Sequence, residues 1–199
     1  MIIGLDFDNT IVCYDRAIAF LAEQHLDLPA ELPRTKLAIR DHLRIEGQEE
    51  AWTRFQGELY GPGMIHAEPF EHALTAIREL AGDHHTLLVI SHRTRFPYLG
   101  RRHDLHAYAK QWILDRLPHS FESVTFHERK EEKLSAIGQL GCQLFVDDLP
   151  EILSDTFFPR STLGVLFSPQ GIPRFWSGVH ISSWRDLPIM VRNSANLRR

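Results

Sequence analysis

Short apolar or alternating runs and helical patterns follow one another along most of this chain. The short runs are bounded by polar residues, which predicts strands, and they occupy residues 1–5, 86–90, 120–127, 143–146, 163–167 and 179–182. Between them, apolar residues recur at helical spacing over residues 70–80, 105–113 and 133–140. Strands that alternate with helices predict an α/β fold with a doubly wound parallel sheet.

Residues 14–64 differ from this alternation of strands and helices, because they contain helical patterns and no strand pattern. Three helices are predicted, with apolar faces formed by Ala17, Ile18, Leu21 and Ala22, by Leu37, Ile39 and Leu43, and by Trp52, Phe55 and Leu59. The glycines and proline at 61–63 end the third helix. We therefore predict an α/β core of residues 1–13 and 65–199, with residues 14–64 as a small helical insertion.

Composition indicates the broad class of protein. Of 199 residues, 43% are hydrophobic and 24% charged, as in ordinary globular proteins, and the net charge of −4 argues against a broad surface for nucleic-acid polymers. Cys13 and Cys142 form no disulfide framework or zinc-ligand spacing, so we expect reduced cysteines and a cytoplasmic location. The apolar start is too short for a signal peptide, and no run is long enough to span a membrane. The sequence indicates no particular oligomeric state.

Three of the predicted strands end in polar residues. Asp6 and Asp8 follow the first, Ser91 ends the second, and Asp147 and Asp148 end a later one. Ligands of open α/β sheets bind at the carboxyl ends of the strands. Asp6 and Asp8 would lie on one side of an extended chain, about 7 Å apart, and would repel each other unless a proton or cation lay between them. Oxygen ligands of this kind suit a hard cation, and Mg²⁺ is the cation expected here.

Lys133 adds a fixed cation at the start of a predicted helix. The metal site, anionic nucleophile, hydroxyl donor and cation together suit the chemistry of a phosphoryl group. Lys130 competes for the cation's role, but Lys133 directly precedes the helical pattern. Thr94 competes with Ser91, but it lies in a loop. Arg93, in the same loop, is a candidate substrate contact, a solvated loop being the alternative.

The order of these groups resembles the haloacid dehalogenase (HAD) superfamily of hydrolases and phosphatases. The resemblance rests on four motifs, which are a DxDx[TV] sequence after an apolar strand, a Ser ending a strand, a Lys opening a helix and an acidic pair ending a strand. They are matched in the family order by Asp6 to Thr10, Ser91, Lys133, and Asp147 with Asp148.

The resemblance implies an Mg²⁺-dependent phosphatase acting on a small phosphorylated metabolite. Asp6 would form an aspartyl phosphate, while Asp8 would protonate the leaving oxygen and then activate water. The ligands of Mg²⁺ would be Asp6, the backbone carbonyl of Asp8, and Asp147. Ser91 and Lys133 would bind phosphate oxygens. Thr10 and Asp148 would have supporting roles.

Residues 14–64 stand where this family places its C1-type cap. The second half of the chain looks most like the 5′(3′)-deoxyribonucleotidase branch, so a nucleoside monophosphate is one candidate substrate beside sugar phosphates and other small phosphomonoesters. Phosphoryl transfer to an acceptor other than water, as in phosphomutases of the family, is an alternative. A binding module without turnover is another, against which the complete set of Asp6, Asp8 and Asp147 argues.

Overall fold

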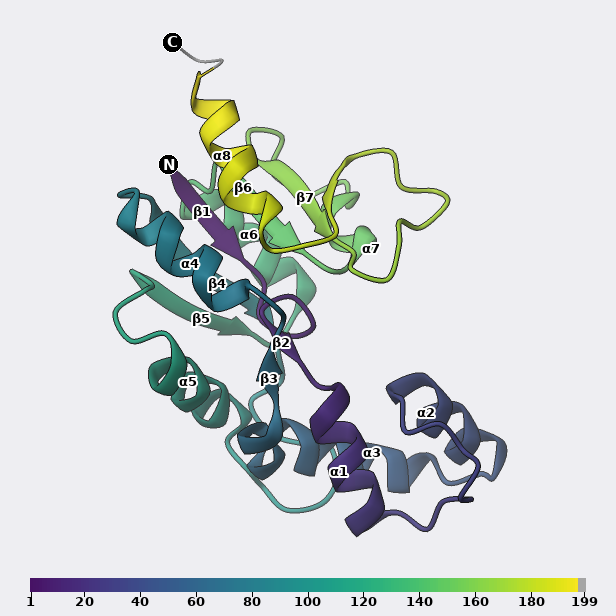
Figure 1. Ribbon diagram of the computed structural model, residues 1–199. Coiled ribbons are helices and arrows are strands. Elements are labelled where there is room, and N and C mark those ends of the chain that lie inside the picture. Colours follow the sequence, from purple (N-terminus) through teal and green to yellow (C-terminus); the bar gives the residue numbers. More distant parts are fainter. Residues whose placement is uncertain (197–199) are drawn as a thin grey trace. The chain divides into compact units, whose positions relative to one another are not determined.

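The computed structural model describes residues 1–196, and it divides into two compact units (Figure 1). Unit 1 comprises Met1–Val12, Pro69–His92 and the chain from Arg116 onward. Unit 2 comprises Cys13–Glu68 and Arg93–Asp115. No described helix is long and apolar enough to cross a membrane.

Unit 1 is built on one parallel sheet, as the alternating pattern predicts. Within residues 1–196 its six strands lie in the order β5-β4-β1-β6-β7-β8. Their bounds are β1 Ile2–Leu5, β4 Thr86–His92, β5 Ser123–His127, β6 Leu144–Asp147, β7 Leu163–Phe167 and β8 Val179–Ile181. The first strand therefore lies between β4 and β6, and the three strands with polar carboxyl ends are neighbours.

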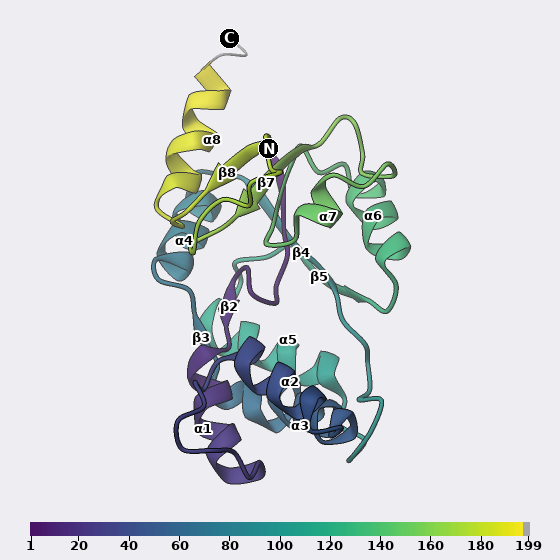
Figure 2. The same cartoon turned by 90° about the vertical axis from the view of Figure 1, so that its right-hand side faces the viewer.

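Helices cover both faces of this sheet, as the view in Figure 2 shows. One face carries α4 (Ala73–Gly82) and α8 (Asp186–Asn196), and the other carries α6 (Lys130–Gln139) and the short α7 (Pro150–Leu153). The apolar core around α6 includes Leu88, Ile90, Leu134, Ile137, Phe145, Ile152 and Leu166. The fold confirms the predicted α/β class with a parallel sheet.

Gly4 in β1 is required by close packing against β6. A Cβ atom at Gly4 would lie 2.5 Å from the Phe145 ring and 2.9 Å from Cys142 Sγ. Any larger residue would therefore push the central strand away from its neighbour. Because β1 carries Asp6 at its end, this packing also determines where that carboxylate lies.

The last helix, α8, is absent from the sequence prediction. Its buried residues Leu187 and Val191 lie one turn apart, so only a short apolar stripe marks the helix in the sequence. Pro188 within its first turn also weakens the helical pattern, although a proline there is compatible with a helix start.

Unit 2 is helical, with the predicted helices at α1 (Asp15–His25), α2 (Lys36–Ile45) and α3 (Glu49–Tyr60), followed by the 3₁₀ helix Pro62–His66 and by α5 (Leu105–Arg116). Trp52 and Phe55 are buried and stack with ring centroids 5.8 Å apart. Leu37, expected on the apolar face of α2, is 60% exposed. The short strands β2 (Val12–Cys13) and β3 (Glu68–Pro69) pair where the chain leaves unit 1 and returns to it.

Residues 93–115 belong to unit 2, whereas the sequence analysis assigned them to the core. Trp112 on α5 donates its indole N–H to the Ala67 carbonyl at 2.9 Å. Pro97 packs so closely on Gly57 that a Cβ there would lie 2.9 Å from it. These contacts join segments far apart in sequence, which an apolar stripe on α5 does not reveal.

Candidate active site

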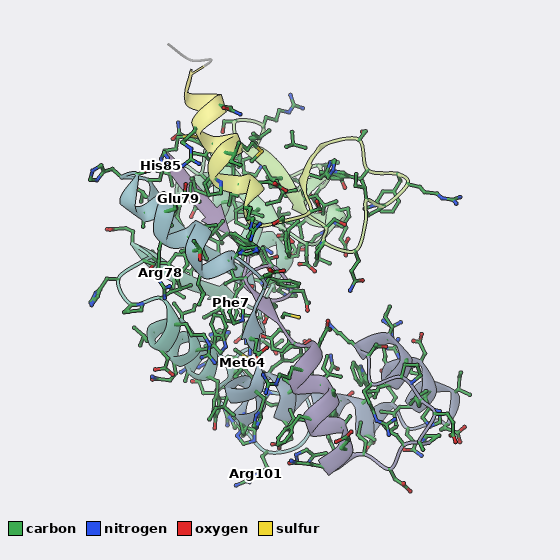
Figure 3. All side chains as sticks on the ribbon, viewed as in Figure 1. Phe7, Met64, Arg78, Glu79, His85 and Arg101 are labelled. Atoms are coloured by element: carbon green, nitrogen blue, oxygen red, sulfur yellow. The ribbon has the colours of Figure 1, made fainter. Side chains whose placement is uncertain are left out.

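The turn after β1 presents the two opening aspartates. The Asp6 N–H donates to the Val146 carbonyl at 2.9 Å, which continues the pairing of β1 with β6. Phe7, labelled in Figure 3, is buried and meets Phe126 edge-on at 5.8 Å. Asn9 has φ 58°, a left-handed conformation that asparagine tolerates better than most residues. Asn9 lies in the turn between Asp8 and Val12, while the pairing of β1 with β6 places Asp6 at the carboxyl end of the sheet.

Asp6 is buried and accepts hydrogen bonds from two other predicted site residues. Ser91 Oγ donates to Asp6 Oδ1 at 2.8 Å, and Lys133 Nζ donates to the same oxygen at 2.6 Å. All three residues are at most 3% exposed. The structure thus brings together residues from β4, α6 and the turn after β1. Thr94, the alternative to Ser91, lies in unit 2.

Lys133 connects the carboxylates of two strand ends. Besides Asp6, its Nζ contacts Asp147 Oδ2 at 2.6 Å, while Asp147 Oδ1 accepts the Leu149 N–H at 3.0 Å. Burial disfavours the charged ammonium, but Asp6 and Asp147 outweigh that cost, so the pKa of Lys133 lies above its ordinary value. Lys130, the alternative, pairs instead with Asp155 at 2.5 Å.

Thr10 joins the opening turn to the acidic pair. Its Oγ1 accepts the Asp148 N–H at 3.1 Å and lies 3.2 Å from Asp6 Oδ2 and 3.3 Å from Asp148 Oδ1. The single hydroxyl proton can be donated to one of these oxygens at a time. Thr10 is fully buried, as is its contact with Asp6, whereas its contacts with Asp148 are partly buried.

Asp6, Asp147 and Asp148 form an acidic group whose ligand oxygens lie within 4.8 Å of one another. Burial and the neighbouring carboxylates raise the pKa of Asp147 to about 7 and that of Asp148 to about 8. Lys133 supplies one positive charge to this group. The donor set therefore fits a hard divalent cation, which would relieve the remaining repulsion.

Asp8 and Arg93 lie outside the acidic group. Asp8 is partly exposed and pairs with Val12 through an isolated backbone bridge. Arg93 is buried in unit 2, where it donates to the Tyr60 carbonyl at 2.6 Å and the Tyr14 hydroxyl at 3.2 Å. The Tyr14 hydroxyl also contacts Met64 Sδ at 3.3 Å (Met64 is labelled in Figure 3). The roles predicted for Asp8 and Arg93 stay predictions.

Trp184 contacts the opening turn and was missed by the sequence analysis. Its indole N–H donates to the Thr10 carbonyl at 3.0 Å, and the side chain is fully buried. The residue lies between β8 and α8, 174 positions from Thr10. A tryptophan in a short segment after a strand carries no signal in the sequence that would link it to the first motif.

The comparisons with known proteins support the fold. No family model matches the chain, and no curated protein matches its sequence. Among solved structures, the chain is similar to Mycobacterium tuberculosis protein tyrosine kinase A, with a TM-score of 0.65, 15% identity and coverage of 96% of this chain and 97% of the other. A predicted phosphatase from Clostridium acetobutylicum matches with a TM-score of 0.64, 12% identity and coverage of 96% and 98%.

A third similar structure is the magnesium-bound HAD hydrolase YfnB from Bacillus subtilis, with a TM-score of 0.60, 13% identity and coverage of 96% and 98%. Several other neighbours are also HAD-superfamily hydrolases, one of them of subfamily IA. At these identities the likeness establishes the α/β fold of HAD proteins, and the chemistry has to be argued from this chain's own residues.

Proposed function

We propose that this protein is an Mg²⁺-dependent phosphatase that hydrolyses a small phosphomonoester through an aspartyl phosphate on Asp6. The observation that supports this most strongly is the contact of Asp6 Oδ1 with both Ser91 and Lys133 in a buried site. A carboxylate held beside a hydroxyl and an ammonium is placed to attack an anionic phosphoryl group, because the same donors can bind the phosphoryl oxygens.

The reaction has two steps on this chain's residues. In the first, an Asp6 oxygen attacks phosphorus, the ester P–O bond breaks, and Asp8 gives its proton to the leaving oxygen. In the second, Asp8 takes a proton from water as the water oxygen attacks phosphorus, which breaks the aspartyl P–O bond and restores Asp6. Ser91 and Lys133 stabilise the charge on the transferring group through both steps.

Mg²⁺ would be held by Asp6, Asp147 and the Asp8 backbone carbonyl, with Asp148 in the supporting acidic group. When bound, it supplies charge neutralisation for the phosphoryl oxygens and allows an anionic substrate to approach an acidic site. The magnesium-bound neighbour YfnB is consistent with this proposal. Residues 14–64, which lie within unit 2, would act as the cap that governs substrate choice, as the resemblance implies.

The substrate class proposed is a small phosphorylated metabolite, with nucleoside monophosphates among the candidates. The neighbour described as a tyrosine kinase favours one alternative, phosphoryl transfer to an acceptor other than water. Product analysis distinguishes the two, because hydrolysis releases one inorganic phosphate per substrate consumed, whereas transfer yields a phosphorylated acceptor.

The test is a phosphate-release screen over p-nitrophenyl phosphate, nucleoside monophosphates and sugar phosphates, with Mg²⁺ and with EDTA. We expect turnover with Mg²⁺, none in EDTA, and recovery when Mg²⁺ is restored. Asp6→Asn should abolish turnover, and Asp41→Asn, an exposed carboxylate on α2, is the matched control. Full activity in EDTA after exhaustive stripping, or in Asp6→Asn, would overturn the proposal.

A further inference from the structure

We infer that Trp184 is a positioning residue for the metal site, acting through the Thr10 carbonyl; this inference rests on the proposed function. The indole N–H donates to that carbonyl at 3.0 Å from a fully buried position. Thr10 in turn contacts Asp6 and Asp148, two of the three clustered carboxylates. The indole is thus two contacts away from Asp6, an expected metal ligand, and from Asp148 of the supporting acidic group.

The turn that carries Thr10 needs an anchor of this kind. Asn9 has φ 58°, a left-handed conformation that persists only where contacts from the surrounding structure offset its cost. The turn is tied to Phe7 by the N–H groups of Ile11 and Val12. Trp184 adds a bond to the Thr10 carbonyl, and the Phe70 N–H adds one to the Ile11 carbonyl at 2.9 Å.

Aromatic packing fixes the position of the indole itself. Trp184 lies 5.8 Å from the Phe167 ring, and Phe167 lies edge-on to Phe70 at 4.8 Å. These three rings come from the segment after β8, the end of β7 and the turn before α4. Close packing of the three rings leaves the indole little room to move, so its N–H stays directed at the Thr10 carbonyl.

The orientation of the Thr10 hydroxyl follows from the backbone that Trp184 holds. Thr10 Oγ1 accepts the Asp148 N–H at 3.1 Å, and its one proton can be donated either to Asp6 or to Asp148. If the Thr10 carbonyl is released, the hydroxyl loses its fixed direction, and Asp6 and Asp148 lose a common partner. Residues that orient metal ligands in this way typically change metal affinity by 10–100-fold when removed.

The test compares two substitutions that remove the same chemical group. Trp184→Phe deletes the N–H but keeps an aromatic ring against Phe167. Trp112→Phe is the matched control, because Trp112 is also buried and donates to a carbonyl at 2.9 Å, but in unit 2. Mg²⁺ affinity is measured by calorimetry without substrate, and the melting temperature is measured for both variants.

We expect both variants to lower the melting temperature by a similar amount, and only Trp184→Phe to weaken Mg²⁺ binding, by roughly tenfold. Raising Mg²⁺ should restore much of the lost kcat of Trp184→Phe, whereas a general loss of stability would not respond in this way. Equal Mg²⁺ affinities in the two variants would overturn the inference.

A double-mutant cycle tests the route through Thr10. Thr10→Val removes the hydroxyl, so adding Trp184→Phe to it should cause little further loss of Mg²⁺ affinity. Fully additive losses would contradict the inference. If the wild-type protein neither binds Mg²⁺ nor releases phosphate, the proposed function has failed. If the wild type does both and Trp184→Phe matches Trp112→Phe, only the role of Trp184 has failed.

Discussion

Lys130 and Lys133 lie one turn apart on α6 and form ion pairs of nearly equal length in very different surroundings. Lys130 contacts Asp155 at 2.5 Å with its side chain 41% exposed. Lys133 contacts Asp6 and Asp147 at 2.6 Å with its side chain 1% exposed. The distances therefore do not separate the two pairs, whereas burial does.

Burial decides what each ion pair contributes. An exposed pair is weakened by water and salt and typically contributes about 0–1 kcal/mol. A buried pair gains little net stability because both charges lose their hydration, but removing one partner leaves an uncompensated charge. The end of α6 that faces solvent thus tolerates change, while the next turn carries a cation on which the carboxylates of the site depend.

Lys133→Met should have the largest effect. It leaves Asp6 and Asp147 buried without their shared cation, and we expect a loss of about 3–5 kcal/mol in the free energy of unfolding. Phosphatase turnover should vanish, because the group that offsets charge on Asp6 and on the phosphoryl oxygens is gone. Chemical denaturation and phosphate release measure the two effects. A Lys133→Met protein that turns over at the wild-type rate would show that Lys133 is not part of the site.

The two opening aspartates provide the next test, since Asp6 is buried and Asp8 is partly exposed. Asp8→Asn leaves the nucleophile in place but removes the acid and base, so turnover should fall by about 10²–10⁴-fold. The loss should be smallest for p-nitrophenyl phosphate, whose leaving group needs little protonation, and larger for an alkyl phosphate.

Trapping of the phosphoenzyme checks this assignment. Asp8→Asn should accumulate an intermediate on Asp6, and Asp6→Asn should accumulate none. A covalent phosphate on Asp8 in the Asp6→Asn variant would mean that the two roles are reversed.

Titration of Asp147 and Asp148 should change stability with pH, by less than the loss of Lys133 does. The pKa values of Asp147 and Asp148 are raised to about 7 and about 8, so the folded protein binds more protons than the unfolded chain above about pH 4. Their stabilising contribution is complete below the unfolded pKa and is lost as pH rises through 7 to 8. The melting temperature of the metal-free protein should therefore fall by a few degrees between pH 6 and pH 8.5.

Mg²⁺ should reduce this fall, because the cation replaces the protons that the acidic group would otherwise bind. Asp148→Asn should also reduce it, by removing one of the two titrating groups. Identical pH profiles of the melting temperature for the wild type and Asp148→Asn would contradict the assignment.

Lys130→Met should have the smallest effect and is the matched control for Lys133→Met. It removes an ion pair whose lysine side chain is 41% exposed, so we expect a much smaller loss of stability than in Lys133→Met, and unchanged turnover. Chemical denaturation of the wild type and the variant at low and at high salt measures how much the ion pair contributes to the free energy of unfolding. A loss of stability comparable to that of Lys133→Met would contradict the comparison drawn from burial.

The sequence alone predicted the parallel sheet and the residues at its carboxyl edge. The apolar runs ending at Asp6, Ser91 and Asp147 sufficed, because period and polarity are local properties of the chain and parallel strands bring their carboxyl ends to one edge. Local pattern also favoured Lys133 over Lys130, and the structure places Lys133 against Asp6 and Asp147.

Only the tertiary structure decided the membership of residues 93–115 in unit 2 and the position of Trp184. Residues 93–115 are tied to unit 2 by contacts that include the Trp112 indole on the Ala67 carbonyl and Pro97 on Gly57. The position of Trp184 is marked by its indole N–H on the Thr10 carbonyl, 174 residues away. Every residue offers a backbone carbonyl as an acceptor. The sequence therefore gives no sign of which carbonyl a buried indole N–H will bind. That choice is made by packing, when the folded chain removes both groups from water and each must be satisfied.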